Sequence, residues 1–245
     1  MAGTLFVTGA SAGIGRAVAE RFLADGWNVA LMARRAGALR EVAAGRANAL
    51  VLPGSVTRPE EVESAFAATL ERFGRIDVLF NNAGRFPPAA LIDEVTVEDW
   101  QAAVDVNLTG MFLAARAAFG AMRRQDPPGG RILNNGSIAA HAPRPGSVAY
   151  TATKHAITGL TRALELDGRP FGITCGQIDI GNARTALSEG FDRGMAQPDG
   201  SVRPEPMMDL APVVEAVVLM ARMPEGASVP FLTVTAAGMP WIGRG

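Results

Sequence analysis

The chain has 245 residues, of which 48% are hydrophobic and 19% are charged, and its formal net charge at pH 7 is −1. These values are typical of a globular protein with a sizeable core in one or two domains, and no basic excess indicates nucleic acid or an anionic membrane as a partner. The longest apolar runs are too short or too interrupted to predict a membrane span, and the first residues enter a strand pattern without a signal-peptide pattern. We therefore expect a cytoplasmic protein.

The first elements predict a strand, a glycine turn and a helix. Residues 5–7 form a short apolar run typical of a buried strand, and residues 16–25 carry an apolar face at helical spacing. Glycines in the intervening turn let the backbone approach a pyrophosphate, which amides at a helix N-terminus can bind. A tight turn with no ligand is the alternative. The candidate cofactor residues of this turn are Gly9, Ser11, Gly13, Ile14 and Gly15.

The second predicted strand, residues 28–32, is followed by Arg34 and Arg35. A site for NAD would place an acid about 20 residues beyond the glycines, where it accepts from a ribose hydroxyl. Arginine at this place favours a 2′-phosphate, so we expect NADP(H), with NAD(H) possible. The alternative is a solvated arginine pair at the start of the next helix.

The remaining elements alternate between strand and helix patterns. Strands are predicted at residues 49–52, 76–80, 130–135, 171–180 and 231–235, and helices at residues 59–73, 97–122, 149–166 and 210–222. Residues 111–122 are apolar on nearly every side, which predicts burial by the core and by another subunit. Asn107 interrupts the long helix, and by itself it is best explained as a satisfied core hydrogen bonder. Residues 181–209 show no clear periodicity, which is typical of a functional lid or a mobile loop.

Tyr150 and Lys154 are the only tyrosine and the only lysine, since the other 22 of the 23 basic residues are arginine. Their spacing places both side chains on one face of a helix. A phenol has a pKa of about 10, so a tyrosine acting as a base near pH 7 requires roughly 4 kcal/mol of stabilisation of its anion. A cation at about 4 Å contributes on the order of 4 kcal/mol at an effective dielectric of 20. Lys154 could therefore supply most of the stabilisation that the tyrosine anion requires. The alternative is a buried tyrosine beside a lysine with no chemical role.

Cysteine and histidine give little support for other chemistry. Cys175 is the only cysteine, so no intrachain disulfide can form, and its apolar surroundings predict a core residue. We expect His155 to face the core or a neighbouring helix, whereas His141, four residues past Ser137, is a candidate for lining a substrate pocket. No metal site is predicted, and the flanks of Ser137 lack the Gly-x-Ser-x-Gly elbow of hydrolases.

From residue 4 to about residue 237 the sequence resembles the short-chain dehydrogenase/reductase family. The matching residues, in the order and approximate spacing of that family, are Thr8-Gly9 with Gly13-Ile14-Gly15, then Asn81-Asn82-Ala83-Gly84, Asn107, Ser137, Tyr150 and Lys154. The resemblance implies an α/β fold, with residues 1–245 as a single Rossmann-type doubly wound domain and a seven-stranded parallel sheet flanked by helices. The irregular segment at residues 182–208 is the expected substrate lid. The resemblance also implies a homotetramer or homodimer, and residues 238–245 are candidates for packing across its interface.

The function implied by the resemblance is oxidoreduction between a carbonyl and a secondary alcohol by hydride transfer. Tyr150 is then the acid/base, Ser137 binds the substrate oxygen, and Lys154 lowers the tyrosine pKa and holds ribose hydroxyls. Asn107 is then a water-positioning residue. The alternative is a catalytically silent dinucleotide-binding regulator or scaffold of the same fold.

Two departures from the family pattern concern the cofactor pocket. The family's Asn-Pro-Gly after the sixth strand is here Asp179-Ile180-Gly181, and the usual acid after the third strand is replaced by Ser55. The full set of expected cofactor contacts is Gly9, Ser11, Gly13, Ile14, Gly15, Arg34, Arg35, Ser55, Val56, Asn82, Ala83, Gly84, Tyr150, Lys154, Gly181, Ala183 and Thr185.

Overall fold

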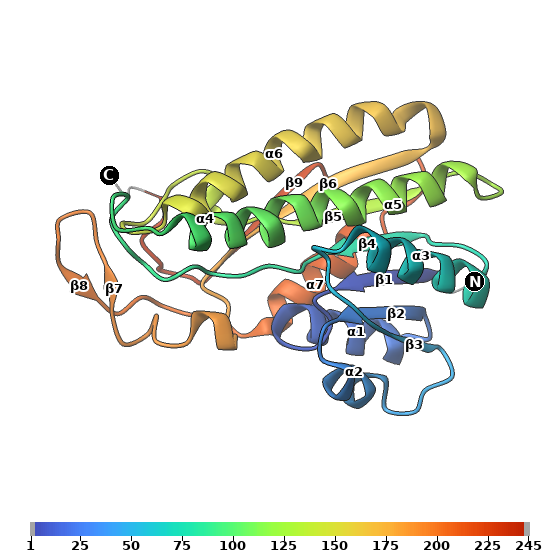
Figure 1. The fold of residues 1–245 in the computed structure, drawn as a ribbon, viewed down its shortest axis with the longest axis horizontal. Coiled ribbons are helices and arrows are strands. Elements are labelled where there is room, and N and C mark those ends of the chain that lie inside the picture. Colours follow the sequence, from blue (N-terminus) through green and yellow to red (C-terminus); the bar gives the residue numbers. More distant parts are fainter. Residues whose placement is uncertain (1–2, 243–245) are drawn as a thin grey trace.

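The computed structural model describes residues 3–242, and a parallel sheet of seven strands runs through the middle of this part of the chain (Figure 1). The strands lie in the order β3-β2-β1-β4-β5-β6-β9, so the order reverses between β1 and β4. Their bounds are β1 (Thr4–Thr8), β2 (Asn28–Ala33), β3 (Ala49–Pro53), β4 (Val78–Asn81), β5 (Gly130–Asn135), β6 (Ile173–Gly181) and β9 (Phe231–Thr235). The predicted Rossmann-type doubly wound architecture is confirmed. Ligands in such sheets bind at the carboxyl ends of the strands, near the reversal of strand order.

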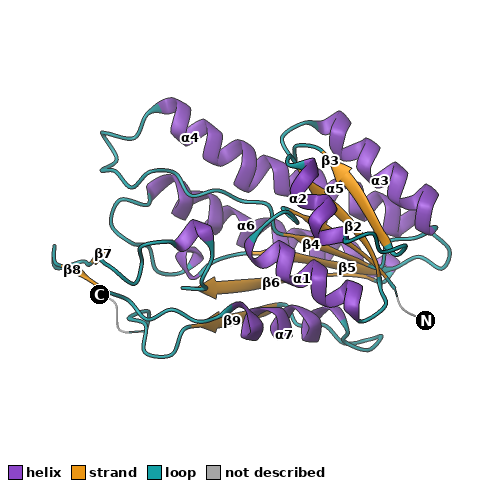
Figure 2. Cartoon of the chain, turned by 90° about the horizontal axis from the view of Figure 1, so that it is seen from below, coloured by secondary structure: helices purple, strands orange, loops and turns teal. Residues whose placement is uncertain are grey.

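Helices cover both faces of the sheet (Figures 1 and 2). One layer consists of α1 (Gly13–Ala24), α2 (Ala36–Ala43) and α7 (Leu210–Ala221). The other consists of α3 (Pro59–Phe73), α4 (Val97–Val104), α5 (Gly110–Arg124) and α6 (Val148–Gly168). A parallel sheet needs both faces covered, because its strands are apolar on both sides.

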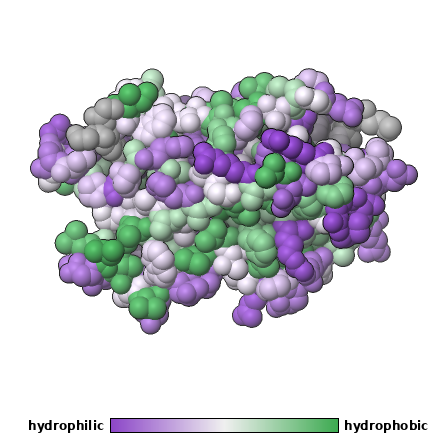
Figure 3. All heavy atoms as spheres, turned by 90° about the horizontal axis from the view of Figure 1, so that it is seen from above, coloured by the Kyte–Doolittle hydropathy of each residue, from purple (hydrophilic) through white to green (hydrophobic). Residues whose placement is uncertain are grey.

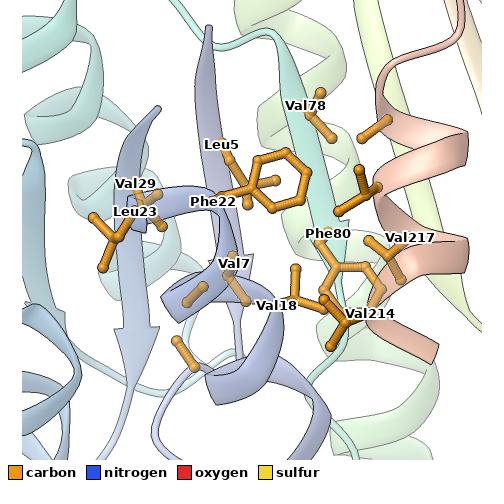
Figure 4. Close-up of a cluster of buried hydrophobic side chains, with 14 of the residues drawn as sticks. Leu5, Val7, Val18, Phe22, Leu23, Val29, Val78, Phe80, Val214 and Val217 are labelled. Atoms are coloured by element: carbon orange, nitrogen blue, oxygen red, sulfur yellow. The ribbon is translucent and has the colours of Figure 1, made fainter. Parts of the chain in front are cut away.

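The pleat of the strands divides the core into two clusters. On β1, Leu5 and Val7 pack with α1 and α7, whereas Phe6 points to the other face and stacks on Phe66 with ring centroids 4.0 Å apart. Figure 4 shows the first cluster, in which Phe22 of α1 lies beside the strand residues. Alternating side chains therefore anchor helices on opposite faces, and the turns that follow the strands are held rigidly.

The long helix predicted for residues 97–122 is observed as α4, a five-residue π-helix η1 (Asp105–Thr109) and α5. By length and composition alone the combined helix of 28 residues, which contains an 18-residue window with a mean hydropathy of 1.2, could span a membrane. This corrects the expectation that every apolar run is too short or too interrupted. The apolar residues Ala114, Ala115 and Ala118 of this helix are fully buried against the sheet. The helix is therefore accounted for as a core helix.

Two irregular regions differ in detail from expectation. The sixth strand begins at Ile173 and not at residue 171, because a 3-10 turn η3 (Arg169–Phe171) precedes it and Gly172 has a φ of 65°. Residues 182–208 contain a 3-10 turn η4 (Ala186–Ser188) and a short antiparallel pair, β7 (Met195–Ala196) with β8 (Val202–Arg203). This hairpin projects from one end of the molecule, away from the seven-stranded sheet (Figures 1 and 2).

Candidate active site

The glycine turn between β1 and α1 requires glycine for two separate reasons. Gly9 and Gly13 have φ angles of 69° and 53°, in the left-handed region that other residues rarely adopt. Gly15 has ordinary dihedrals, but a Cβ on it would lie 2.5 Å from both Asn82 Nδ2 and Gly9 O. The turn therefore leads into the N-terminus of α1 without side chains at these three positions, as close approach of a phosphate requires.

The segment after β4 is tied to this turn by Thr8. Its hydroxyl accepts hydrogen bonds from the backbone N–H of Asn82 (2.8 Å) and of Ala83 (3.0 Å). The Asn82 amide donates to Thr8 O (3.0 Å) and accepts from Asn135 Nδ2 (2.8 Å). The carboxyl ends of β1, β4 and β5 are thus joined through side-chain amides.

The structure places one of the two predicted arginines beside the glycine turn. Arg35 Nη2 lies 3.3 Å from Ser11 Oγ, and both Arg34 and Arg35 are exposed at the start of α2. The hydroxyl of Ser55 is hydrogen-bonded to that of Thr57 (2.9 Å).

A carboxylate that was not predicted from the sequence, that of Glu61, also lies beside Ser55. Glu61 Oε2 accepts from the backbone N–H of Ser55 (2.6 Å), although Glu61 belongs to α3. The next residue, Val56, is buried against Gly110, where a Cβ would lie 2.7 Å from Val56 Cγ2.

The start of the 182–208 segment lies against the glycine turn. A Cβ on Gly13 would lie 3.3 Å from Thr185 Cγ2, and Thr185 begins η4 with a capping box to Ser188. Gly181 is enclosed, since a Cβ there would be 2.8 Å from Met239 Sδ, and Ala183 forms a parallel bridge with Met208. The predicted cofactor residues at the strand ends therefore lie at the carboxyl ends of the strands.

Ser137, Tyr150 and Lys154 converge at the end of β5. Ser137 caps the 3-10 turn η2 (Ile138–Ala140), accepting from Ala139 N (3.1 Å), and its side chain is near enough to the Tyr150 phenol to lower the pKa of that group. Lys154 is 4% exposed, donates to Asn135 O (2.7 Å), and places Nζ 5.5 Å from the centroid of the Tyr150 ring.

Burial dominates the proton affinities of both groups on α6. It raises the pKa of the Tyr150 phenol to about 12, with Asp179 adding to the rise and with Ser137 and Arg144 opposing it. It lowers the pKa of Lys154 to about 8, against the charge of Asp179. This differs from the expectation that Lys154 supplies most of a downward shift, since the cation that lowers the phenol pKa here is Arg144. The Tyr150 phenol is therefore protonated at neutral pH.

Asn107 is fully buried in the π-helix η1. Its amide brackets the backbone of Arg85, accepting from Arg85 N (2.8 Å) and donating to Arg85 O (3.0 Å), and it also approaches Thr153 Oγ1 (3.4 Å). Single-turn π-bulges often occur at functional sites. The amide is satisfied as a core hydrogen bonder would be and it also lies against α6, so its water-positioning role stays a prediction.

An aromatic cluster over Tyr150 was not predicted from sequence. The Phe86 ring stacks on the Tyr150 ring at 4.0 Å, and Phe191 meets Phe86 edge-on at 6.2 Å. The guanidinium of Arg144 lies 5.0 Å above the Phe191 ring. These residues belong to irregular segments, where side-chain directions cannot be read from periodicity.

A second unpredicted feature is a buried ionic network that holds residues 182–208. Glu205, at 2% exposure, accepts from Arg144, from Asn182 Nδ2 (2.8 Å) and from Gln197 Nε2 (3.1 Å). Arg144 also donates to Asn182 Oδ1 (2.6 Å). The network connects the segment to the loop that leads into α6.

The two histidines lie in different surroundings. His141 bonds through Nε2 to the buried Asp179 (2.8 Å), and its ring meets Trp241 edge-on at 6.2 Å. The expectation for His155 was wrong, because it lies on the outer face of α6, exposed, with Nδ1 3.0 Å from Thr151 O.

Cys175, metal binding and the C-terminal segment add no further group to the candidate site within the described residues. Cys175 is a buried core residue, and burial raises the pKa of its thiol. Within residues 3–242 no group of acidic, cysteine and histidine side chains could hold a metal ion. Trp241 packs beside Met239 within its own chain, and residues 243–245 lie outside the described part.

Comparison with known proteins places this site in a family. Residues 3–195 match the family model of short chain dehydrogenases. The chain is 35% identical over 191 residues to 3beta-hydroxysteroid dehydrogenase of Mediterraneibacter gnavus, covering 76% of this chain and 67% of that protein. It is 34% identical over 191 residues to 3-oxoacyl-[acyl-carrier-protein] reductase of Synechocystis sp., covering 76% of each. Its fold matches 3-ketoacyl-(acyl-carrier-protein) reductase of Brucella melitensis, complexed with NADH, at a TM-score of 0.85 and 26% identity, over 96% of this chain and 97% of that chain.

The chain therefore belongs to the short-chain dehydrogenase family. Its relatives are dehydrogenases and reductases, so the protein is an NAD(P)-dependent oxidoreductase that uses a nicotinamide dinucleotide and acts on a small molecule.

Proposed function

We propose that this protein interconverts a carbonyl and a secondary alcohol, with Tyr150 as the acid/base. The observation that carries the proposal is the continuous connection from the glycine turn to the tyrosine. Asn82 bonds to Thr8 and to Asn135, and the carbonyl of Asn135 accepts from Lys154, one helical turn beyond Tyr150. A phenol, a hydroxyl and an ammonium thus lie directly beside a dinucleotide cradle.

The residues at the carboxyl ends of the strands fit a dinucleotide, since Gly9, Gly13 and Gly15 let the turn pack closely without side chains that would keep a phosphate from its backbone. Amides of the glycine turn and of the first turn of α1 would hold the pyrophosphate, and Lys154 would hold ribose hydroxyls. When bound, the nicotinamide supplies or accepts the hydride.

The protein must then move a proton on the substrate oxygen. In reduction, Tyr150 gives its phenolic proton to that oxygen while Ser137 donates a hydrogen bond to it, which stabilises the developing negative charge. In oxidation the phenolate takes the proton of the alcohol. Lys154 and Asn107 would return the proton through water to solvent, and the 182–208 segment would act as a lid that excludes water from the hydride path.

The cofactor preference that we propose is NADP(H). Arg35 lies beside Ser11, and a guanidinium can pair with two phosphate oxygens. One charge-assisted contact contributes about 1.5 to 3 kcal/mol, which corresponds to roughly ten- to hundredfold tighter binding of NADPH than of NADH. The double variant Arg34→Asp with Arg35→Ala should lose this preference, while Arg40→Ala, an exposed arginine on the same helix, should keep it. Equal wild-type affinities would contradict the proposal.

The test of the reaction is oxidation of NADPH and NADH over a panel of ketones and aldehydes, with Tyr150→Phe as the control. Turnover by the wild type that is lost in Tyr150→Phe supports the proposal. A wild type that binds the dinucleotide but turns over no compound would favour the silent regulator or scaffold. Because the substrate-facing segments are irregular, the panel also identifies the preferred carbonyl class.

We also propose a homotetramer or homodimer. A groove of about 590 Å³ runs between α3, α5 and α6, and Phe66, Phe112, Phe119 and Leu164 line it. Figure 3 shows hydrophobic patches between hydrophilic ones on the side of the molecule where α6 lies. Phe112 on α5 is exposed, and we propose that the same groove of a second subunit packs over it.

A further inference from the structure

The reaction derived above makes no use of Asp179, although this acid lies at the centre of the site. Its carboxylate is 1% exposed and accepts three hydrogen bonds. Oδ1 accepts from the backbone N–H of Ser137 (2.9 Å) and from Gln177 Nε2 (2.8 Å), and Oδ2 lies 2.8 Å from His141 Nε2. Burying a carboxylate costs free energy unless hydrogen-bond donors compensate the lost water, so these three bonds show that the protein is arranged to hold Asp179 at this place.

The carboxylate is fixed against the backbone that carries Ser137. A Cβ on Gly136 would lie 2.1 Å from Asp179 Oδ1, so a larger residue there would displace the acid. Gln177 is itself held, since its Oε1 accepts from Thr161 (3.1 Å) and its Nε2 donates to Thr158 (3.1 Å). The position of Ser137 therefore depends on a carboxylate that cannot move freely.

The charge of Asp179 also acts on the two groups of α6. It raises the pKa of Tyr150, in addition to the larger effect of burial, and it raises the pKa of Lys154 against burial. Within residues 3–242, His141 is the only side chain in an ion-pairing position with Asp179. The other charged groups around the phenol and the carboxylate are Lys154 on α6, Arg144 before it, Glu205 from the 182–208 segment, and Arg85 with Asp99 beyond Asn107.

We propose that Asp179 is a positioning residue, held by His141, whose buried carboxylate fixes the backbone of Ser137 and places a negative charge beside the proton-transfer groups of α6. For turnover this rests on the proposed reaction, in which protonated Tyr150 is the donor for reduction. The consequence is directional, because alcohol oxidation needs the phenolate and therefore requires a higher pH than it would without Asp179.

The sole lysine allows a test that needs no substrate. Protein labelled with [13C]lysine gives one side-chain resonance, and its shift against pH reports the midpoint of Lys154, which we expect at about 8 in the wild type. Asp179→Asn keeps the shape and an acceptor for Ser137, and its amide can donate to His141. We expect a lower Lys154 midpoint in Asp179→Asn and a midpoint near wild type in His141→Gln, which keeps a donor and the charge of Asp179. An unchanged or higher midpoint in Asp179→Asn would overturn the proposal.

If Asp179→Asn does not fold, Asp179→Ser removes the same charge and leaves room for water, and the same lowering is expected. The second readout is the pH profile of alcohol oxidation. At pH values below the midpoint of the profile, the folded variant that lacks the Asp179 charge should oxidise the alcohol roughly two- to tenfold faster than the wild type. Each rate is taken relative to the high-pH plateau of the same protein. A lower plateau with an unmoved midpoint would show a merely structural role and overturn the proposal. An inactive wild type would refute the proposed reaction, while the lysine titration would still decide the role of Asp179.

Discussion

At the scale of single residues, Tyr150 and Lys154, the proposed acid/base and its partner, are brought together by helix geometry, whereas their neighbours come from distant parts of the chain. Tyr150 and Lys154 stand out because each is unique and they are four positions apart, a local pattern that helix geometry converts into proximity. The contact of His141 with Asp179 spans 38 residues, and the Phe86 ring reaches Tyr150 from a loop. Such contacts depend on where strands and loops meet in space, which no local pattern encodes.

The burial of Lys154 predicts that the lysine costs stability. Its pKa is depressed from 10.5 to about 8, so its contribution to stability is present above pH 10.5 and is lost as the pH falls through 8. At pH 7 the buried ammonium therefore costs about 3 kcal/mol, less what the bond to Asn135 returns. Lys154→Met should be inactive yet more stable than the wild type at pH 7, by about 1 to 3 kcal/mol in urea unfolding. A gain that persists at pH 10.5, or no gain at pH 7, would contradict this explanation.

At the scale of elements, periodic segments were predicted well and irregular ones were not. The bounds of α3, β5 and β9 agree with the sequence pattern, because capping residues and apolar runs mark them clearly. The π-helix at Asn107 and the β7–β8 hairpin were not predicted, since neither has a distinctive hydrophobic period. The periodic segments supply the scaffold of the candidate site, and the irregular segments supply the side chains that we expect to face the substrate.

The 182–208 segment should behave as a lid with an ionic anchor. Bound cofactor should slow its amide hydrogen exchange, because Thr185 lies against the glycine turn. Glu205→Gln should speed exchange there roughly tenfold in the free protein, since it weakens charge-assisted bonds to Arg144. Asp199→Asn, whose partners lie within the β7–β8 hairpin, should change only local amides. Equal exchange with and without cofactor would argue against a lid.

At the scale of the whole molecule, the order of the strands follows from the βαβ pattern. The oligomeric state depends on surface side chains, which that pattern does not describe. The apolar run at residues 111–122 indicated burial on several sides, and the structure leaves Phe112 exposed at 48% on the outer side of α5. We expect light scattering to give a tetramer, about four times 25.6 kDa, or a dimer. Phe112→Glu should lower the mass of the assembly, and Leu219→Glu on α7, an apolar position exposed at 55%, should not. A wild-type monomer at micromolar concentration would refute the assembly.

We propose that this NAD(P)-dependent oxidoreductase moves the substrate proton through Tyr150. The most direct measurement is a single-turnover reduction at saturating NADPH, with the carbonyl found by the panel, in the wild type and in Tyr150→Phe. Phenylalanine keeps the ring that stacks on Phe86 and removes only the hydroxyl. We predict that NADPH affinity changes less than threefold while hydride transfer slows by about 10² to 10⁴. A Tyr150→Phe variant that transfers hydride at the wild-type rate would contradict the account.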